Sequence, residues 1–170
     1  MGSNMFERVL LCYDGSAAGR RALKRGAELA ILVKAQVYVL SIIPEGIVDP
    51  VIVAAAAGHA CLVDDEADYR KLLEESIDWL TARGVPAQGY LAKGNIVDQI
   101  LAHAKQFAVD LIVLGYYPHP SGGYGWSRAP RVSLAERANC CVFVAVTTPN
   151  NSSYELPICE SVPESILLNP

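Results

Sequence analysis

Residues 8–16 read Arg-Val-Leu-Leu-Cys-Tyr-Asp-Gly-Ser. The first six form a short, nearly continuous apolar run, which is typical of a strand buried on both faces of a parallel sheet. Asp14-Gly15-Ser16 breaks this run with residues that favour turns. Because Ser16 can accept a hydrogen bond from the first turn of a helix, we predict a helix from this cap to about Val33.

The same alternation of apolar strand and helix continues along the chain. Apolar and β-branched runs predict further strands at residues 36–43, 86–92, 111–114 and 140–146. Three- and four-residue spacing of apolar side chains predicts helices over about 69–80, 95–107 and 132–138. Strands that alternate with helices form a parallel sheet with helices on both faces, so we expect an α/β fold. Pro86 places the third strand nearer an edge of that sheet.

Length and composition indicate one packed domain. The chain has 170 residues, is 52% apolar and carries a net charge of −4. This charge argues against broad binding to nucleic acid or anionic membranes. We expect no membrane span and no signal peptide, and therefore a cytoplasmic protein. We place the domain at residues 5–147, treat residues 1–4 as an expression remnant, and expect an irregular C-terminal tail over residues 148–170.

Motifs for covalent or metal chemistry are missing from the sequence. The five cysteines are odd in number and lack Cys-x-x-Cys or Cys/His spacing, so we expect neither a disulfide framework nor a zinc site. There is no Walker A run, nucleophile elbow or His-Glu-x-x-His. We therefore name no catalytic residue and favour a role other than catalysis, while an enzyme stays open.

Topology alone points to a site. In parallel α/β sheets, ligands bind at the carboxyl ends of the strands where the strand order reverses. If the first and fourth strands are neighbours, that point brings together Asp14-Gly15-Ser16 and the loop after Gly115.

Several motifs occur in the order of a known family. They are the strand and turn at residues 9–16, Gly-Asn-Ile at 94–96, the apolar strand at 108–115, and the closing strand at 138–144. Over residues 5–147 the sequence thereby resembles the universal stress protein family, with Cys141 where proline is usual. The resemblance implies a Rossmann-like five-stranded sheet, for which we expect the strand order 3-2-1-4-5. It also implies a homodimer and, in many members, a site for ATP or a related adenine nucleotide.

The phosphate loop departs from the family's pattern. That pattern is Gly, two residues, Gly, nine residues, then Gly and Ser or Thr. Here it begins at Gly115, but Pro118, Arg128 and Ala129 fill the remaining positions. Proline has no N–H to donate to a phosphate. Gly122 and Gly123 offer a shifted loop, and Arg128 offers charge in place of backbone donors.

The candidate cofactor-binding residues are therefore Asp14, Gly115, Gly122, Gly123 and Arg128. Asp14 either holds a ribose hydroxyl or an adenine edge, or only forms the turn. Gly115 either admits the ligand or only ends its strand, and Arg128 is either an anion ligand or a solvated charge.

The sequence leaves three functions open. The first is a stress-response regulator, homodimeric through the Val142–Val146 strand, whose altered cleft binds ATP weakly or not at all. The alternative is an ATP-binding switch that uses the rearranged glycine-rich loop, with slow hydrolysis. The third is an unrelated Rossmann-like enzyme. The sequence identifies neither the signal nor a protein partner.

Overall fold

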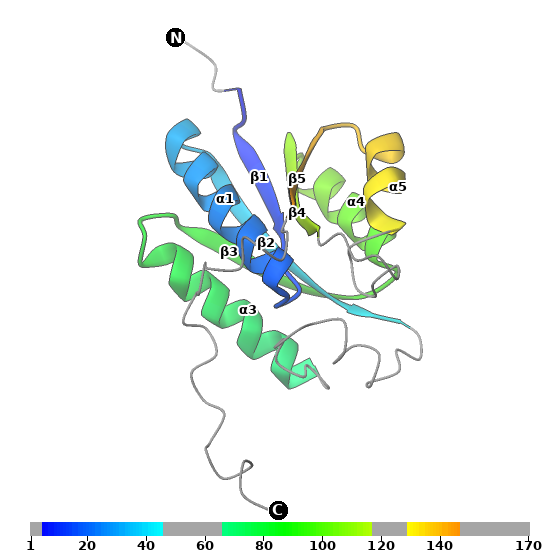
Figure 1. Ribbon diagram of the computed structural model, residues 1–170, viewed down its shortest axis with the longest axis horizontal. Coiled ribbons are helices and arrows are strands. Elements are labelled where there is room, and N and C mark those ends of the chain that lie inside the picture. Colours follow the sequence, from blue (N-terminus) through cyan, green and yellow to red (C-terminus); the bar gives the residue numbers. More distant parts are fainter. Residues whose placement is uncertain (1–4, 46–65, 117–128, 147–170) are drawn as a thin grey trace, which may run out of the picture.

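The computed structural model describes residues 5–45, 66–116 and 129–146. Within them, a parallel five-stranded sheet lies between helices (Figure 1). The strands are β1 (Arg8–Cys12), β2 (Gln36–Pro44), β3 (Ala87–Gly94), β4 (Leu111–Tyr116) and β5 (Cys141–Val146). The helices are α1 (Ala17–Val33), α3 (Glu66–Thr81), α4 (Ile96–Gln106) and α5 (Ala129–Arg137). The order β3-β2-β1-β4-β5 confirms the predicted topology and the Rossmann-like α/β fold.

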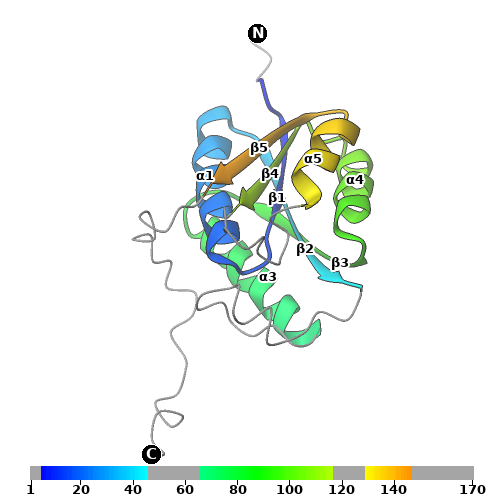
Figure 2. The same ribbon diagram turned by 45° about the vertical axis from the view of Figure 1, so that its right-hand side comes forward.

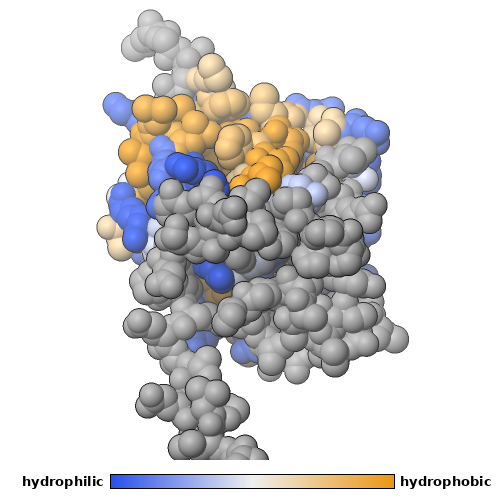
Figure 3. Space-filling view, viewed as in Figure 1, coloured by the Kyte–Doolittle hydropathy of each residue, from blue (hydrophilic) through white to orange (hydrophobic). Residues whose placement is uncertain are grey.

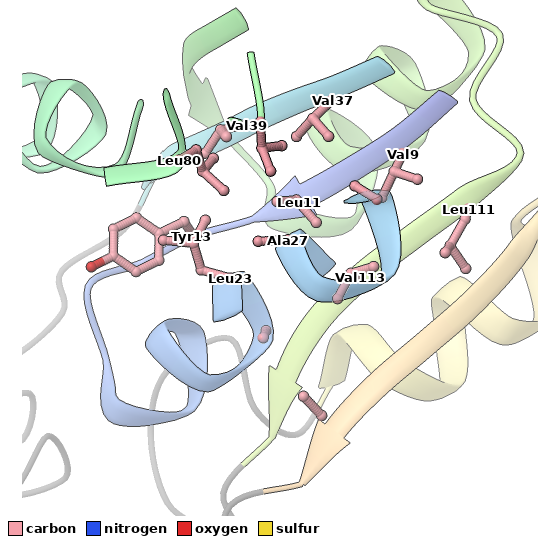
Figure 4. Packing of buried hydrophobic residues seen from close by; sticks show 14 of the residues in the cluster. Val9, Leu11, Tyr13, Leu23, Ala27, Val37, Val39, Leu80, Leu111 and Val113 are labelled. Carbon is pink, nitrogen blue, oxygen red and sulfur yellow. The ribbon is translucent and has the colours of Figure 1, made fainter. Parts of the chain in front are cut away.

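Strand β1 lies at the centre of the sheet, because it pairs with β2 on one side and β4 on the other. Val9 and Leu11 face the layer of α1 and α3, whereas Leu10 and Cys12 face the layer of α4 and α5 (Figures 2 and 4). All four side chains are at most 3% exposed. The nearly continuous apolar run in the sequence therefore reflects burial on both faces.

Asp110 joins the amino ends of three strands. Its carboxylate Oδ2 accepts hydrogen bonds from the backbone N–H groups of Glu7 at 2.8 Å and Arg8 at 3.2 Å. Its own N–H donates to the carbonyl of Arg8, and its carbonyl accepts from the N–H of Cys141, both at 3.1 Å. This one residue holds the starts of β1, β4 and β5 in register.

The predicted cap at Ser16 is confirmed, and Asn95 caps α4 in the same way. Ser16 Oγ accepts a hydrogen bond from the N–H of Gly19 at 2.9 Å, and Asn95 Oδ1 accepts one from the N–H of Asp98 at 3.2 Å. Each bond satisfies a backbone donor that a helix leaves unpaired in its first turn.

The predicted end of the fourth strand was wrong. Gly115 does not stop β4, because Gly115 and Tyr116 pair with Ala145 and Val146 of β5. Glycine occupies this strand position because a Cβ at position 115 would collide with the backbone carbon and oxygen of Ala18. A glycine within a strand often marks such a close approach of another backbone.

Other boundaries shift by a few residues. β3 runs to Gly94 rather than Ala92, because its pairing with β2 continues to Pro44. β5 begins at Cys141 rather than Cys140, and α5 begins at Ala129. β3 is an edge strand, as Pro86 indicated. In the part of the chain that the structure describes, no helix has both the length and the apolarity needed to cross a membrane.

Gly26 allows α1 to lie close to β1. A Cβ at position 26 would collide with Leu11 Cδ2, and Leu11 is only 1% exposed. The side chain of Leu11 has little room to move, because protein cores are densely packed.

We therefore expect Gly26→Ala to lower the free energy of unfolding by about 1–3 kcal/mol. This loss should appear although alanine is the better helix former by about 1 kcal/mol. Urea unfolding measures the change. The control repeats the substitution in a Leu11→Ala background, where the colliding atom is gone and Gly26→Ala should become neutral or stabilising. An equal loss in both backgrounds would show that Leu11 is not the cause.

Candidate functional site

A chain of hydrogen bonds holds the turn between β1 and α1. The N–H and Oγ–H of Ser16 both donate to Asp14 Oδ1, at 3.0 and 2.6 Å. Ser16 Oγ then accepts from Gly19, so the carboxylate is linked to the helix cap. Between them Gly15 has a φ of +75°, which is the left-handed region that favours glycine. Asp14 is therefore a turn-former in this structure, whatever else it binds.

Asp14 and Gly115 approach the first turn of α1 from two sides. A Cβ at Gly19 would collide with Asp14 Oδ1, whereas a Cβ at Gly115 would lie 2.7 Å from the N of Gly19. The expected meeting of the first and fourth strands at their carboxyl ends is therefore present, with Gly19 between the two candidate residues. Their role in binding a ligand stays a prediction.

Three other candidates lie outside the described residues. These are Gly122, Gly123 and Arg128, all from the loop that follows β4. Their predicted roles in a phosphate site stay predictions.

Opposing effects act on the charge of Asp14, and their net effect raises its pKa. Burial raises the pKa of Asp14, while the hydrogen bonds from Ser16 and the charge of Arg20 act in the opposite direction. Arg20 is fixed beside the turn, because its Nη1 donates to the carbonyl oxygen of Gly15 at 2.5 Å. On α3, burial and the charge of Asp14 raise the pKa of Tyr69. The structure therefore adds Arg20 and Tyr69 to the surroundings of Asp14.

Tyr13 places a hydroxyl group beneath this turn. The side chain is fully buried, and its hydroxyl has no hydrogen-bond partner among the described residues. Figure 4 shows this hydroxyl pointing away from Leu11 and Leu23. Burial raises the pKa of Tyr13 above its usual range, so the phenol stays neutral.

These groups suit binding more directly than covalent chemistry. Burial raises the pKa of the neighbouring Cys12 thiol above its usual range, which keeps it protonated and a poor nucleophile. In the residues that the structure describes, no group of three or more His, Cys, Asp or Glu side chains could hold a metal ion. A carboxylate, hydroxyls and a guanidinium can together bind a ligand that carries both hydrogen-bond donors and acceptors, such as a ribose.

Asp14→Asn tests the electrostatic description of the turn. The raised pKa means that the folded protein holds this proton more tightly than the unfolded chain. The stability that Asp14 contributes is therefore complete below the ordinary aspartate pKa, and it is lost as pH rises through the folded pKa. Asparagine keeps an oxygen acceptor but does not titrate.

We expect the stability of the wild type relative to Asp14→Asn to fall as the pH rises above the ordinary aspartate pKa of about 4, by roughly 1.4 kcal/mol for each unit of pKa difference. Urea unfolding across this range measures it. Parallel profiles for the two proteins would show that Asp14 titrates alike in the folded and unfolded states.

Known proteins resemble this chain along most of its length. Universal stress protein YxiE of Bacillus subtilis (strain 168) is 30% identical over 120 residues, which cover 65% of this chain and 79% of the relative. Universal stress protein UspA of Lactobacillus plantarum has a similar fold, with a TM-score of 0.66 and 18% identity over 85% of this chain and 99% of its own.

Similar folds have also been solved with nucleotides. An Arabidopsis thaliana universal stress protein with AMP bound has a TM-score of 0.59 and 14% identity, over 85% of this chain and 94% of its own. A universal stress protein with cAMP and one from Archaeoglobus fulgidus with dAMP have TM-scores of 0.60 and 0.56. Their identities are 18% and 17%, over 82% of this chain and 97% and 98% of theirs.

The fold and the order of the sequence motifs both agree with one protein family. The match to the universal stress protein family extends over residues 5–126, well over half of the chain. This chain therefore belongs to the universal stress protein family.

Proposed function

We propose that this chain is a homodimeric stress-response regulator whose cleft, at the carboxyl ends of β1 and β4, binds adenine nucleotides weakly. The observation that carries the proposal is the geometry of Asp14. Both hydrogen bonds from Ser16 end on Oδ1, so neither of them uses the other oxygen, Oδ2. An ionised carboxylate oxygen accepts strong hydrogen bonds, and the hydroxyl groups of a ribose can donate them.

The similar solved structures support adenine nucleotides as the ligand class. AMP, dAMP and cAMP share an adenosine-like part and one phosphate. A ligand of this size relies mainly on the base and sugar, so it depends less on a cradle for several phosphates.

The sequence of the phosphate loop supports weak binding of ATP. At the loop positions where the family has glycines and a hydroxyl, this chain has Pro118, Arg128 and Ala129. Each missing hydrogen bond to a charged phosphate typically weakens binding by about 1.5–3 kcal/mol. The additional phosphates of ATP should therefore contribute little, and AMP and ATP should bind with similar affinity.

The competing proposal is an ATP-binding switch with slow hydrolysis. Gly122 and Gly123 could supply backbone donors at shifted positions, and Arg128 could supply charge. The two proposals differ in how strongly the added phosphates of ATP increase affinity.

Titration calorimetry with AMP and with ATP plus magnesium separates the two proposals. We expect dissociation constants above about 10 μM for both nucleotides, within roughly threefold of each other. Asp14→Ala should weaken AMP binding about tenfold or more, because a hydrogen bond to a charged group is lost. Asp78→Ala, an exposed carboxylate change on α3, is the control and should leave binding unchanged.

Thermal unfolding shows whether the Asp14→Ala variant still folds. If it does not fold, Asp14→Asn replaces it in the binding experiment, because asparagine keeps the oxygen acceptor of the turn but removes the charge. A submicromolar constant for ATP would favour the switch. No effect of Asp14→Ala on binding would place the nucleotide elsewhere.

The proposal of a homodimer is based on the two edge strands of the sheet. β5 is an edge strand with the sequence Cys-Val-Phe-Val-Ala-Val, which has neither charge nor proline to block pairing. The opposite edge, β3, carries Lys93 and two glycines. Because exposed edges without such blocking residues tend to pair with another chain, β5 is the edge suited to self-association.

We expect sedimentation velocity to show a dimer at micromolar concentration. Phe143→Lys should raise the dissociation constant by at least about tenfold, because it places a charge in the strand that pairs. Lys93→Ala on the other edge is the control and should leave the dimer intact. A wild-type monomer at this concentration would contradict the proposal.

A further inference from the structure

The outer face of helix α1 is basic, although the chain as a whole carries a net charge of −4. Four basic residues lie on this helix against one acidic residue, Glu28. They are Arg20, Arg21, Lys24 and Arg25, and none of the five side chains is fully buried. Arg25 and Glu28 form an exposed ion pair at 2.7 Å, so the face keeps a net positive charge.

The end of the same face is apolar. Ile31 is 53% exposed and Leu32 is 80% exposed, both in the last turn of α1. Figure 3 shows apolar colour gathered over this end of the helix. Single exposed apolar residues are common, but an apolar patch that continues a charged face marks an interaction surface. Electrostatic complementarity then requires a partner that carries acidic and apolar groups together.

Strand β5 ends beside the first turn of α1. Gly115 of β4 lies against Ala18 of α1 and pairs with Ala145 of β5, and α1 also packs against β5. Figure 2 shows the carboxyl end of β5 next to this helix. The chain that follows Val146 therefore starts at the beginning of α1.

The flank of α1 that carries Ala18 leads from this point to the apolar end. Residues at three- and four-residue spacing lie on the same side of a helix. From Ala18 this row continues through Arg21 and Arg25 to Leu32. A segment that follows the flank thus meets basic side chains first and an apolar one last.

The sequence after β5 has the complementary composition. Residues 147–170 contain three acidic residues and no Lys, Arg or His. Each acidic residue has a large apolar residue one or two positions later; the pairs are Glu155 and Leu156, Glu160 and Val162, and Glu164 and Ile166. Helix α3 would repel such a segment, because it carries five acidic residues against two basic ones.

The length of the chain fits this path. The 17 residues of α1 span about 25 Å, at about 1.5 Å for each residue. An extended chain advances by about 3.3 Å for each residue, so about eight residues cover the same distance. Glu155 is the ninth residue after Val146. Its carboxylate can therefore reach Arg25, and the apolar residues that follow can reach Leu32.

We propose that the outer face of α1 is a docking surface for residues 147–170 of the same chain. Glutamates of this segment pair with the basic side chains, and Leu156 and Ile158 cover Ile31 and Leu32. Exposed ion pairs are individually weak, but the direct connection to β5 gives the segment a high effective concentration at the helix. The inference uses neither the homodimer nor nucleotide binding, so it can fail without them.

Arg25→Glu and Arg70→Glu form a matched pair of tests. Each reverses the charge of an exposed arginine that pairs with a glutamate of its own helix at 2.7 Å. Thermolysin cuts before large apolar residues, and its rate follows the fraction of time for which a segment is undocked. We expect Arg25→Glu to speed cleavage within residues 147–170 by about threefold or more.

Arg70→Glu is the control and should leave this cleavage rate unchanged. Mass spectrometry locates the cuts, and circular dichroism with thermal unfolding shows that both variants fold.

A neutral segment tests the ionic contact itself. Glutamine replaces Glu155, Glu160 and Glu164 together, and Arg25→Glu is then compared with Arg25 in this background. The comparison is made within one segment sequence, so effects of glutamine on the protease cancel. We expect Arg25→Glu to have no further effect on cleavage there.

Cross-linking identifies the copy that holds the segment. A carbodiimide joins a lysine amine to a carboxylate in contact with it, and Lys24 is the lysine of the basic face. In an equal mixture of isotopically labelled and unlabelled protein, we expect cross-links from Lys24 to glutamates of residues 147–170 within single chains.

Four outcomes would overturn the inference. They are an unchanged cleavage rate in Arg25→Glu, equal acceleration by Arg70→Glu, and an effect of Arg25→Glu that persists with the neutral segment. The fourth is cross-linking between labelled and unlabelled chains, which would place the segment on a second copy.

Discussion

The contact between the first turn of α1 and the backbone of β4 leaves no room for a side chain at position 115. This steric constraint sets how closely α1 approaches the sheet. On α1 itself, Gly19 lies against Asp14 and Gly26 lies against Leu11, and a Cβ at either position would also collide. In this position of the helix, Ser16 Oγ caps α1 by accepting from Gly19 and also donates its hydrogen to Asp14. The position of the candidate site therefore follows from close packing of backbones and does not depend on a ligand.

Much of the fold could be predicted because its signals are local. The run at residues 8–13 is apolar throughout since β1 is covered on both faces, and each cap is visible as a polar residue before a helix. Pro86 correctly indicated an edge strand. The end of β4 was misjudged because glycine usually interrupts strands, and the reason for keeping it, the backbone of Ala18, lies almost a hundred residues away in the sequence.

The site could be predicted only in outline. Topology and the family pattern correctly predicted that Asp14 and Gly115 meet at the carboxyl ends of β1 and β4, because strand order determines where carboxyl ends meet, while their role in binding stays a prediction. Arg20 and Tyr69 gave no such signal, since a charged or aromatic residue on a helix surface is ordinary until its neighbours are known. Tyr13 did carry a signal, a hydroxyl within an aliphatic strand, but only the structure shows that the hydroxyl is buried without a partner among the described residues.

The bonds of Asp110 also bear on how the chain is made. They join residues that are 102 and 103 positions apart, so during synthesis on the ribosome β1 is complete long before β4 exists. Until then β1 has β2 beside it but an open apolar edge where β4 belongs. Loop closure over such a distance slows folding, and unpaired apolar edges favour aggregation. The most buried strand of the finished protein is thus the one that needs the longest protection in the nascent chain.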